Sequence, residues 1–195
     1  MKGAAVAAAV VITWVWMALE IGLRVRDRRR GAGSTAGDGR TRLTITLLIA
    51  ASMIVAIVVA IVLPADSPLR FPGSSVPWAV LGILLMVSGL SLRIWSIAVL
   101  GKSFRTTVEV DADQTVVNSG PYRWVRHPSY SGMLLLTIGY GIASDNWISL
   151  LVTIVLPAAA LLRRIGLEEE VLVETLGRPY EEYRIGTKRL VPGVW

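Results

Sequence analysis

The chain has 195 residues, a formal net charge of +6, no cysteine, one histidine and 53% hydrophobic residues. The lack of cysteine excludes disulfides, thiolate nucleophiles and cysteine-ligated metal sites, and a single histidine argues against a histidine-based one, so we expect no bound metal. The basic residues lie between long apolar runs. This pattern indicates membrane orientation and contact with membrane lipids rather than binding of nucleic acid.

Three apolar runs are long enough to cross a membrane. Gly3 to Leu23 contains one charged residue, Glu20, Leu43 to Leu63 contains none, and Val76 to Leu100 contains only Arg93. Each run reaches the roughly 20 residues that a helix needs to span about 30 Å of hydrocarbon. The sequence therefore predicts an all-α, multi-pass membrane protein.

Two shorter apolar runs follow, Tyr130 to Ser144 and Trp147 to Leu162, separated by Asp145-Asn146. At about 1.5 Å per residue, a helix of 15 or 16 residues is shorter than the hydrocarbon core. We expect these two runs to form a short helical hairpin, the fourth and fifth of five transmembrane helices, with a kink at Pro157. The hairpin either does not fully cross the membrane or extends its cytoplasmic ends into the site.

The charges between the runs predict the topology. The loop 24–42 carries seven arginines against Asp27 and Asp38, which places it in the cytoplasm by the positive-inside rule. Five spans then put the N-terminus outside and the C-terminus in the cytoplasm. The membrane would be the plasma membrane in a prokaryote and the endoplasmic reticulum in a eukaryote, and we expect a monomer.

The last 30 residues differ in kind. Arg163 to Leu176 is predicted to be a separate, charged amphipathic helix that ends at Gly177, and Pro179 can begin a short second helix. Gly139-Tyr140-Gly141 lies within an apolar run, so no Rossmann domain is expected. We divide the chain into residues 1–100, the first three membrane helices, and residues 101–195, the catalytic region.

The segment 120–132 holds the only histidine, His127, next to arginines and tyrosines at the start of an apolar run. Such a cluster is tolerated at a membrane only where the protein or water covers it. Pro128 suits the first position of a helix, whose free amides at residues 129–132 can bind an anion such as a carboxylate. This pattern predicts a ligand site at the membrane surface.

A second polar cluster follows at Arg164 and Glu168. The two residues are four apart, so on a helix they share one face and can bind one polar ligand from two sides. The alternative is a solvated ion pair worth about 0.3–0.5 kcal/mol. Two further charges lie within the apolar runs: we expect Glu20 to pair with Arg24, and Arg93 either reaches the cytoplasm or lines the pocket.

These motifs resemble the cofactor region of the isoprenylcysteine carboxyl methyltransferase family. The first half of the resemblance is Gln114-Thr115-Val116-Val117, Gly120, Tyr122, Arg126-His127-Pro128-Ser129-Tyr130 and Gly132. The second half is Arg164, Glu168-Glu169-Glu170, Leu172, Gly177, Tyr180 and Tyr183. The resemblance covers Thr107 to the C-terminus.

The resemblance implies S-adenosylmethionine as cofactor, bound at the cytoplasmic membrane surface, and methyl transfer to the carboxylate of a prenylated cysteine. Arg164 would hold that carboxylate. The implied cofactor contacts are Gln114, Thr115, Val116, Val117, Tyr122, His127, Pro128, Ser129, Tyr130 and Glu168.

Three other functions stay open at this point. A lipid-amine or phospholipid N-methyltransferase would need an acceptor that loses a proton, whereas this chain offers Arg164. A sterol-reductase-like enzyme would need a site for the NADPH 2′-phosphate. A small transporter or scaffold would more often show repeats and mid-membrane helix breaks.

Overall fold

The computed structural model describes residues 2–29, 36–107 and 115–193. In these ranges the chain is helical and contains no strand. The helices are α1 (Lys2–Arg29), α2 (Ala36–Val62), α3 (Ser75–Leu100), α4 (Pro128–Ala143), α5 (Trp147–Leu176) and α6 (Arg178–Gly186), with short 3-10 helices at Gly101–Ser103 and Gly120–Arg123.

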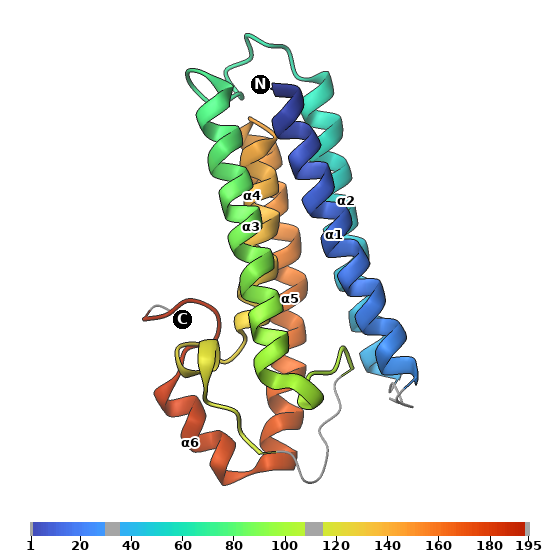
Figure 1. Ribbon diagram of the computed structural model, residues 1–195, viewed down its shortest axis with the longest axis vertical. Helices are drawn as coiled ribbons and strands as arrows, with labels where there is room; N and C mark the ends of the chain where they lie inside the picture. The colour runs from blue at the N-terminus through green and yellow to red at the C-terminus, as the bar shows by residue number, and fades with distance from the viewer. Residues whose placement is uncertain (1, 30–35, 108–114, 194–195) are drawn as a thin grey trace.

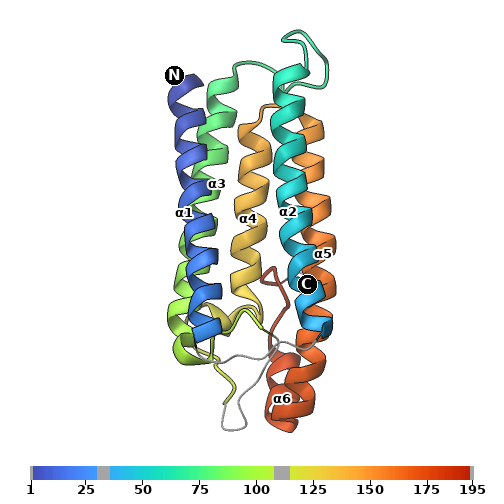
Figure 2. The same ribbon diagram turned by 90° about the vertical axis from the view of Figure 1, so that its right-hand side faces the viewer.

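Four helices of the described chain, α1, α2, α3 and α5, are long and apolar enough to cross a membrane. The protein is thus a multi-pass membrane protein, and α1 to α5 run side by side as one bundle (Figure 1). The remaining bundle helix, α4, has 16 residues, or about 24 Å. The ends of α1 and α5, the start of α2, and α6 all lie at the same end of the bundle (Figure 2).

Helix α5 corrects one expectation. It continues without a break from Trp147 to Leu176, with Pro157 inside it, so the predicted boundary between Leu162 and Arg163 is wrong. The buried stripe continues across that point, because Leu161 and Ile165 are both buried. The predicted amphipathic helix is therefore the last part of α5, which reaches beyond the neighbouring helix α4.

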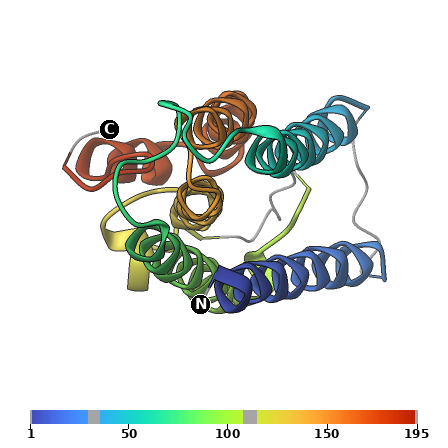
Figure 3. The same cartoon turned by 90° about the horizontal axis from the view of Figure 1, so that it is seen from above.

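Helix α4 lies between α3 and α5 (Figure 3), and glycines bring its backbone against α3. A Cβ atom added at Gly89 would lie 2.5 Å from the carbonyl oxygen of Gly132, and one added at Gly82 would lie 2.5 Å from that of Gly139. Small residues allow such close approach of membrane helices. These contacts fix the position of α4, whose first turn carries the predicted ligand site.

Candidate active site

A cavity of about 320 Å³ lies inside the bundle at the end that carries α6. Both predicted polar clusters contribute to its wall. The lining includes nine of the predicted site residues: Thr115, Val116, Val117, Tyr122, His127, Ser129, Tyr130, Arg164 and Glu168. Pro128 lies buried at the first position of α4, and Gln114 falls outside the described residues.

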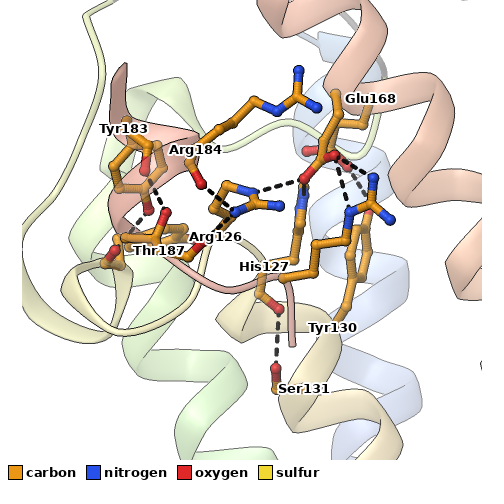
Figure 4. Close-up of polar contacts among 11 residues, drawn as sticks. Arg126, His127, Tyr130, Ser131, Glu168, Tyr183, Arg184 and Thr187 are labelled. Carbon is orange, nitrogen blue, oxygen red and sulfur yellow. Dashed lines mark hydrogen bonds and ion pairs between the residues drawn. The ribbon is translucent and has the colours of Figure 1, made fainter. Parts of the chain in front are cut away.

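Arg164 and Glu168 occupy the same side of α5. The Tyr130 hydroxyl donates to Oε2 of Glu168 at 2.8 Å (Figure 4). The Arg164 side chain is 3% exposed and donates from Nη1 to Oγ1 of Thr41 and from Nη2 to the carbonyl oxygen of Thr106, both at 2.9 Å. A carboxylate and a guanidinium therefore face one cavity, held by contacts from α4, α2 and the loop after α3.

The first turn of α4 departs from the prediction of free amides. The backbone N–H groups of Tyr130 and Ser131 both donate to the His127 carbonyl, at 3.0 and 3.1 Å. The prediction that these two amides bind an anion is therefore wrong. The side chain of Ser129 also has a hydrogen-bond partner, because its hydroxyl accepts from Nη1 of Arg93 at 2.8 Å. What this turn presents to the cavity is its side chains.

Glu169 organises the wall behind the cavity, and the sequence analysis gave it no role. Its buried carboxylate accepts from Nε of Arg126 at 2.8 Å and from Nε of Arg189 at 3.1 Å, and lies 3.3 Å from Nε2 of His127. A signal did exist in the sequence. Glu169 follows the apolar Ile165 by four residues, and both are buried on the same face of α5.

The segment 187–190 lies along the loop that precedes α4. The backbone N–H groups of Arg126 and His127 donate to the carbonyls of Lys188 and Arg189, at 2.7 and 3.0 Å. The Ser131 hydroxyl donates to the Leu190 carbonyl at 2.6 Å. Together with Glu169, this segment holds His127 in place, and the His127 ring stacks on Tyr130 with 5.7 Å between ring centroids.

Glu20 and Arg93 form a buried pair that the sequence analysis did not predict. Nε and Nη2 of Arg93 donate to the two oxygens of Glu20 at 2.5 and 2.9 Å, and the Trp16 indole donates to Glu20 at 2.9 Å. The predicted pair of Glu20 with Arg24 is wrong, because Arg24 donates instead to Thr46 on α2. Of the two alternatives for Arg93, the structure shows the one in which it lines the cavity.

Tyr180 is a further lining residue that the sequence analysis left without a role. Its side chain is buried, and its hydroxyl has no hydrogen-bond partner within the described residues. Burial and the carboxylates of Glu169 and Glu168 raise the pKa of Tyr180 above its ordinary value, so this hydroxyl stays protonated. An unpaired buried donor costs about 1–3 kcal/mol, which a ligand in the cavity can recover.

The part of the cavity beside α1 and α2 is mostly apolar. The apolar lining there consists of Trp16, Met17, Ile21, Ile45, Ile49, Ala50 and Met53, and the same two helices add the polar side chains of Glu20, Arg24, Arg42 and Thr46. One cavity thus joins charged and hydroxyl groups near α4–α6 to a hydrocarbon-lined slot beside the first two helices. Such a cavity suits a ligand with a polar head group and a hydrocarbon chain.

Comparison with known proteins agrees with this geometry. Residues 80–174 match the family model described as "Isoprenylcysteine carboxyl methyltransferase (ICMT) family". Just under half of the chain is thus similar to this family. The matched range includes most of the predicted site and ends before α6.

Three curated relatives are similar to the chain over much of its length. Protein-S-isoprenylcysteine O-methyltransferase B of Arabidopsis thaliana is 32% identical over 58% of this chain and 59% of its own length. Protein-S-isoprenylcysteine O-methyltransferase of Saccharomyces cerevisiae is 35% identical over 54% of this chain and 45% of its own. A probable protein-S-isoprenylcysteine O-methyltransferase of Oryza sativa subsp. indica is 29% identical over 70% and 73%. The chain thus spans about half the length of the first two of these methyltransferases.

The fold also resembles a solved one. The structure of the eukaryotic intramembrane Ras methyltransferase ICMT superposes with a TM-score of 0.62 and 24% identity, covering 76% of this chain and 52% of that chain. At this identity the likeness establishes the fold alone, namely the membrane fold of the ICMT family.

Proposed function

We propose that the protein is an S-adenosylmethionine-dependent methyltransferase that esterifies the carboxylate of a prenylated cysteine. The observation that carries this proposal is the single cavity that joins a polar pocket to an apolar slot, with Arg164 in its wall. The names of the relatives give the same reaction for those proteins.

The donor set of the polar pocket fits the cofactor. Glu168 suits its ammonium group or its ribose hydroxyls, and the unpaired Tyr180 hydroxyl suits one of its acceptor atoms. Leu172 and Tyr183 add an apolar and an aromatic surface for the adenine ring. When bound, S-adenosylmethionine supplies an electrophilic methyl group.

The residues of the chain then need to bind and orient the acceptor. An α-carboxyl group has a pKa of about 3.3–3.7 and is ionised at pH 7, so no general base is required. Arg164 can bind the carboxylate with two parallel hydrogen bonds and fix the direction of the attacking oxygen. The apolar slot takes the prenyl chain and excludes water from the carboxylate, which strengthens its contact with Arg164.

We further propose five membrane spans, with the N-terminus outside and the cavity opening toward the cytoplasm. The end of α1, the start of α2 and α6 lie at the same end of the bundle (Figure 2), which supports placing the arginine-rich ends of α1 and α2, together with α6, on the cytoplasmic side. Reporter fusions within residues 24–42 and at the C-terminus that report opposite sides of the membrane would refute the topology.

The experiment that tests the function compares wild type with Arg164→Lys, Arg164→Ala and, as a matched control, Arg163→Ala. Arg163 is the adjacent arginine of α5 and is exposed. We expect methyl transfer to a prenylcysteine analogue to fall about 10- to 100-fold in both Arg164 variants, because one charge-assisted contact is worth about 1.5–3 kcal/mol. Arg163→Ala should stay close to wild type.

The same samples are tested by calorimetry for binding of S-adenosylhomocysteine and of NADPH. We expect binding of the first and none of the second. Near-normal transfer in Arg164→Ala would reject the role of Arg164, and NADPH binding would favour a reductase. Methylation of a lipid amine in place of the carboxylate would favour the N-methyltransferase.

A further inference from the structure

The last turn of α1 is hydrogen-bonded to the loop that follows α3. Asp27 is buried, and its Oδ2 accepts from the backbone N–H of Thr106 at 2.6 Å. Its Oδ1 accepts from Nε and Nη2 of Arg26, at 3.1 and 3.0 Å. Nη2 of Arg26 also donates to the carbonyl of Phe104 at 2.6 Å. Two adjacent side chains of α1 thus hold the main chain of residues 104–106.

The loop in turn holds Arg164. The carbonyl oxygen of Thr106, the residue whose N–H is bound by Asp27, accepts from Nη2 of Arg164 at 2.9 Å. Nη1 of the same guanidinium donates to Thr41 at the start of α2. The orientation of the guanidinium is therefore set from outside α5, by a peptide group that α1 fixes and by a hydroxyl of α2.

We infer that Asp27 is a positioning residue for Arg164, acting through the backbone of Thr106. The inference rests on the proposed role of Arg164 as the group that binds the acceptor carboxylate. A planar guanidinium binds a carboxylate bidentately only in a narrow range of orientations. Asp27 lies outside the family-matched range 80–174, so the first helix contributes to the acceptor site in a way that the match does not describe.

This arrangement predicts a selective defect. Asp27→Asn keeps the size of the side chain but removes the charge that accepts from Thr106 and Arg26. The Thr106 carbonyl then loses its fixed position, and Arg164 no longer presents its two donors together. Within the described residues, Asp27 makes its hydrogen bonds with Arg26 and Thr106 and not with the polar pocket around Glu168, Tyr130 and Tyr180. That pocket should therefore keep its affinity for S-adenosylhomocysteine.

The test is a double-mutant cycle of Asp27→Asn and Arg164→Ala in the full-length, detergent-solubilised protein. The readout is calorimetric binding of a prenylcysteine to the protein saturated with S-adenosylhomocysteine, which cannot react. We expect Asp27→Asn to weaken prenylcysteine binding about tenfold, or about 1.4 kcal/mol, with affinity for S-adenosylhomocysteine within twofold of wild type. In the Arg164→Ala background, Asp27→Asn should have no further effect.

Controls separate the possible failures. Asp66→Asn, an exposed aspartate in the loop at the opposite end of the bundle, should bind both ligands as wild type does. If Asp27→Asn does not fold, Asp27→Glu takes its place; it keeps the charge, moves the carboxylate by one methylene, and should weaken prenylcysteine binding less but selectively.

The inference would be overturned if Asp27→Asn weakened prenylcysteine binding equally in the wild-type and the Arg164→Ala background. An equal loss of affinity for prenylcysteine and for S-adenosylhomocysteine would also overturn it. If Arg164→Ala itself leaves prenylcysteine binding unchanged, it is the proposed role of Arg164 that fails.

Discussion

Replacing Gly89 by alanine adds one methyl group at the contact between α3 and α4. This substitution tests both the packing of the two helices and the dependence of the cavity on that packing. A Cβ atom there would lie 2.5 Å from the Gly132 carbonyl oxygen and 2.6 Å from the Leu136 backbone nitrogen. Both are backbone atoms of α4, so no side-chain rotation relieves the clash. Gly89→Ala therefore requires α3 and α4 to move apart by several tenths of an ångström or more.

The expected cost follows from two opposing effects. Alanine is favoured over glycine inside a helix by about 0.5–1 kcal/mol. Extra volume in a close-packed contact costs about 1–3 kcal/mol. Gly22→Ala provides the matched control, because Gly22 lies inside α1 and has no atom within 4 Å of its added Cβ. The helix gain is common to both variants, so the difference between them is the packing cost of about 1–3 kcal/mol.

Thermal unfolding in one detergent measures that difference. For a chain of this size, about 2–4 °C in Tm corresponds to 1 kcal/mol, so Gly89→Ala should melt about 2–12 °C below Gly22→Ala. Binding of S-adenosylhomocysteine should weaken in Gly89→Ala alone, because α4 carries part of the cavity wall. Equal melting temperatures in the two variants would refute the close contact of α3 and α4.

Three further experiments test polar side chains of the bundle. Glu169→Gln keeps the shape of the side chain but leaves its cationic partners uncompensated, and we expect a loss of about 3 kcal/mol, seen as earlier melting and faster proteolysis of the segment 187–190. Tyr180→Phe should weaken S-adenosylhomocysteine binding about 2- to 10-fold without lowering the stability of the ligand-free protein, whereas Tyr183→Phe should lower stability, because the Tyr183 hydroxyl donates to a backbone carbonyl at 2.6 Å; equal stability of the two phenylalanine variants would contradict this assignment. Arg93→Met should cost about 3–5 kcal/mol by leaving Glu20 unpaired, and adding Glu20→Gln should restore part of that loss, an outcome that a simple packing defect at Arg93 would not give.

The membrane helices could be predicted because uncharged apolar runs of about 20 residues indicate membrane-spanning helices. The end of the fifth helix could not. Arg163-Arg164 suggested a membrane boundary, yet Arg164 is buried and donates to Thr41 and Thr106. Whether a charge ends a helix in the membrane depends on partners from other segments, and those partners are set by the tertiary fold.

The same limit applies to the site. Spacing alone predicted that Arg164 and Glu168 share a face, and local motifs marked several residues between 115 and 130 that line the same cavity. The Glu20–Arg93 pair joins residues 73 positions apart, so the local i,i+4 rule selected the wrong partner. The Tyr180 hydroxyl lacks a hydrogen-bond partner because of the residues that surround it in the tertiary structure. The periodicity of the sequence does not predict those surroundings.

The buried charges also explain why the first two helices belong to the site although their sequences carry no motif. Lipid cannot satisfy Glu20 or Arg164, so each binds across helices, to Arg93 on α3 and to Thr41 on α2. Each contact ties α1 or α2 to an element that lines the cavity. A rotation of either helix would expose a charge to hydrocarbon, which costs several kcal/mol. The apolar slot is thus held beside the polar pocket by electrostatics, and this is the arrangement that the proposed binding of a prenylcysteine carboxylate by Arg164 requires.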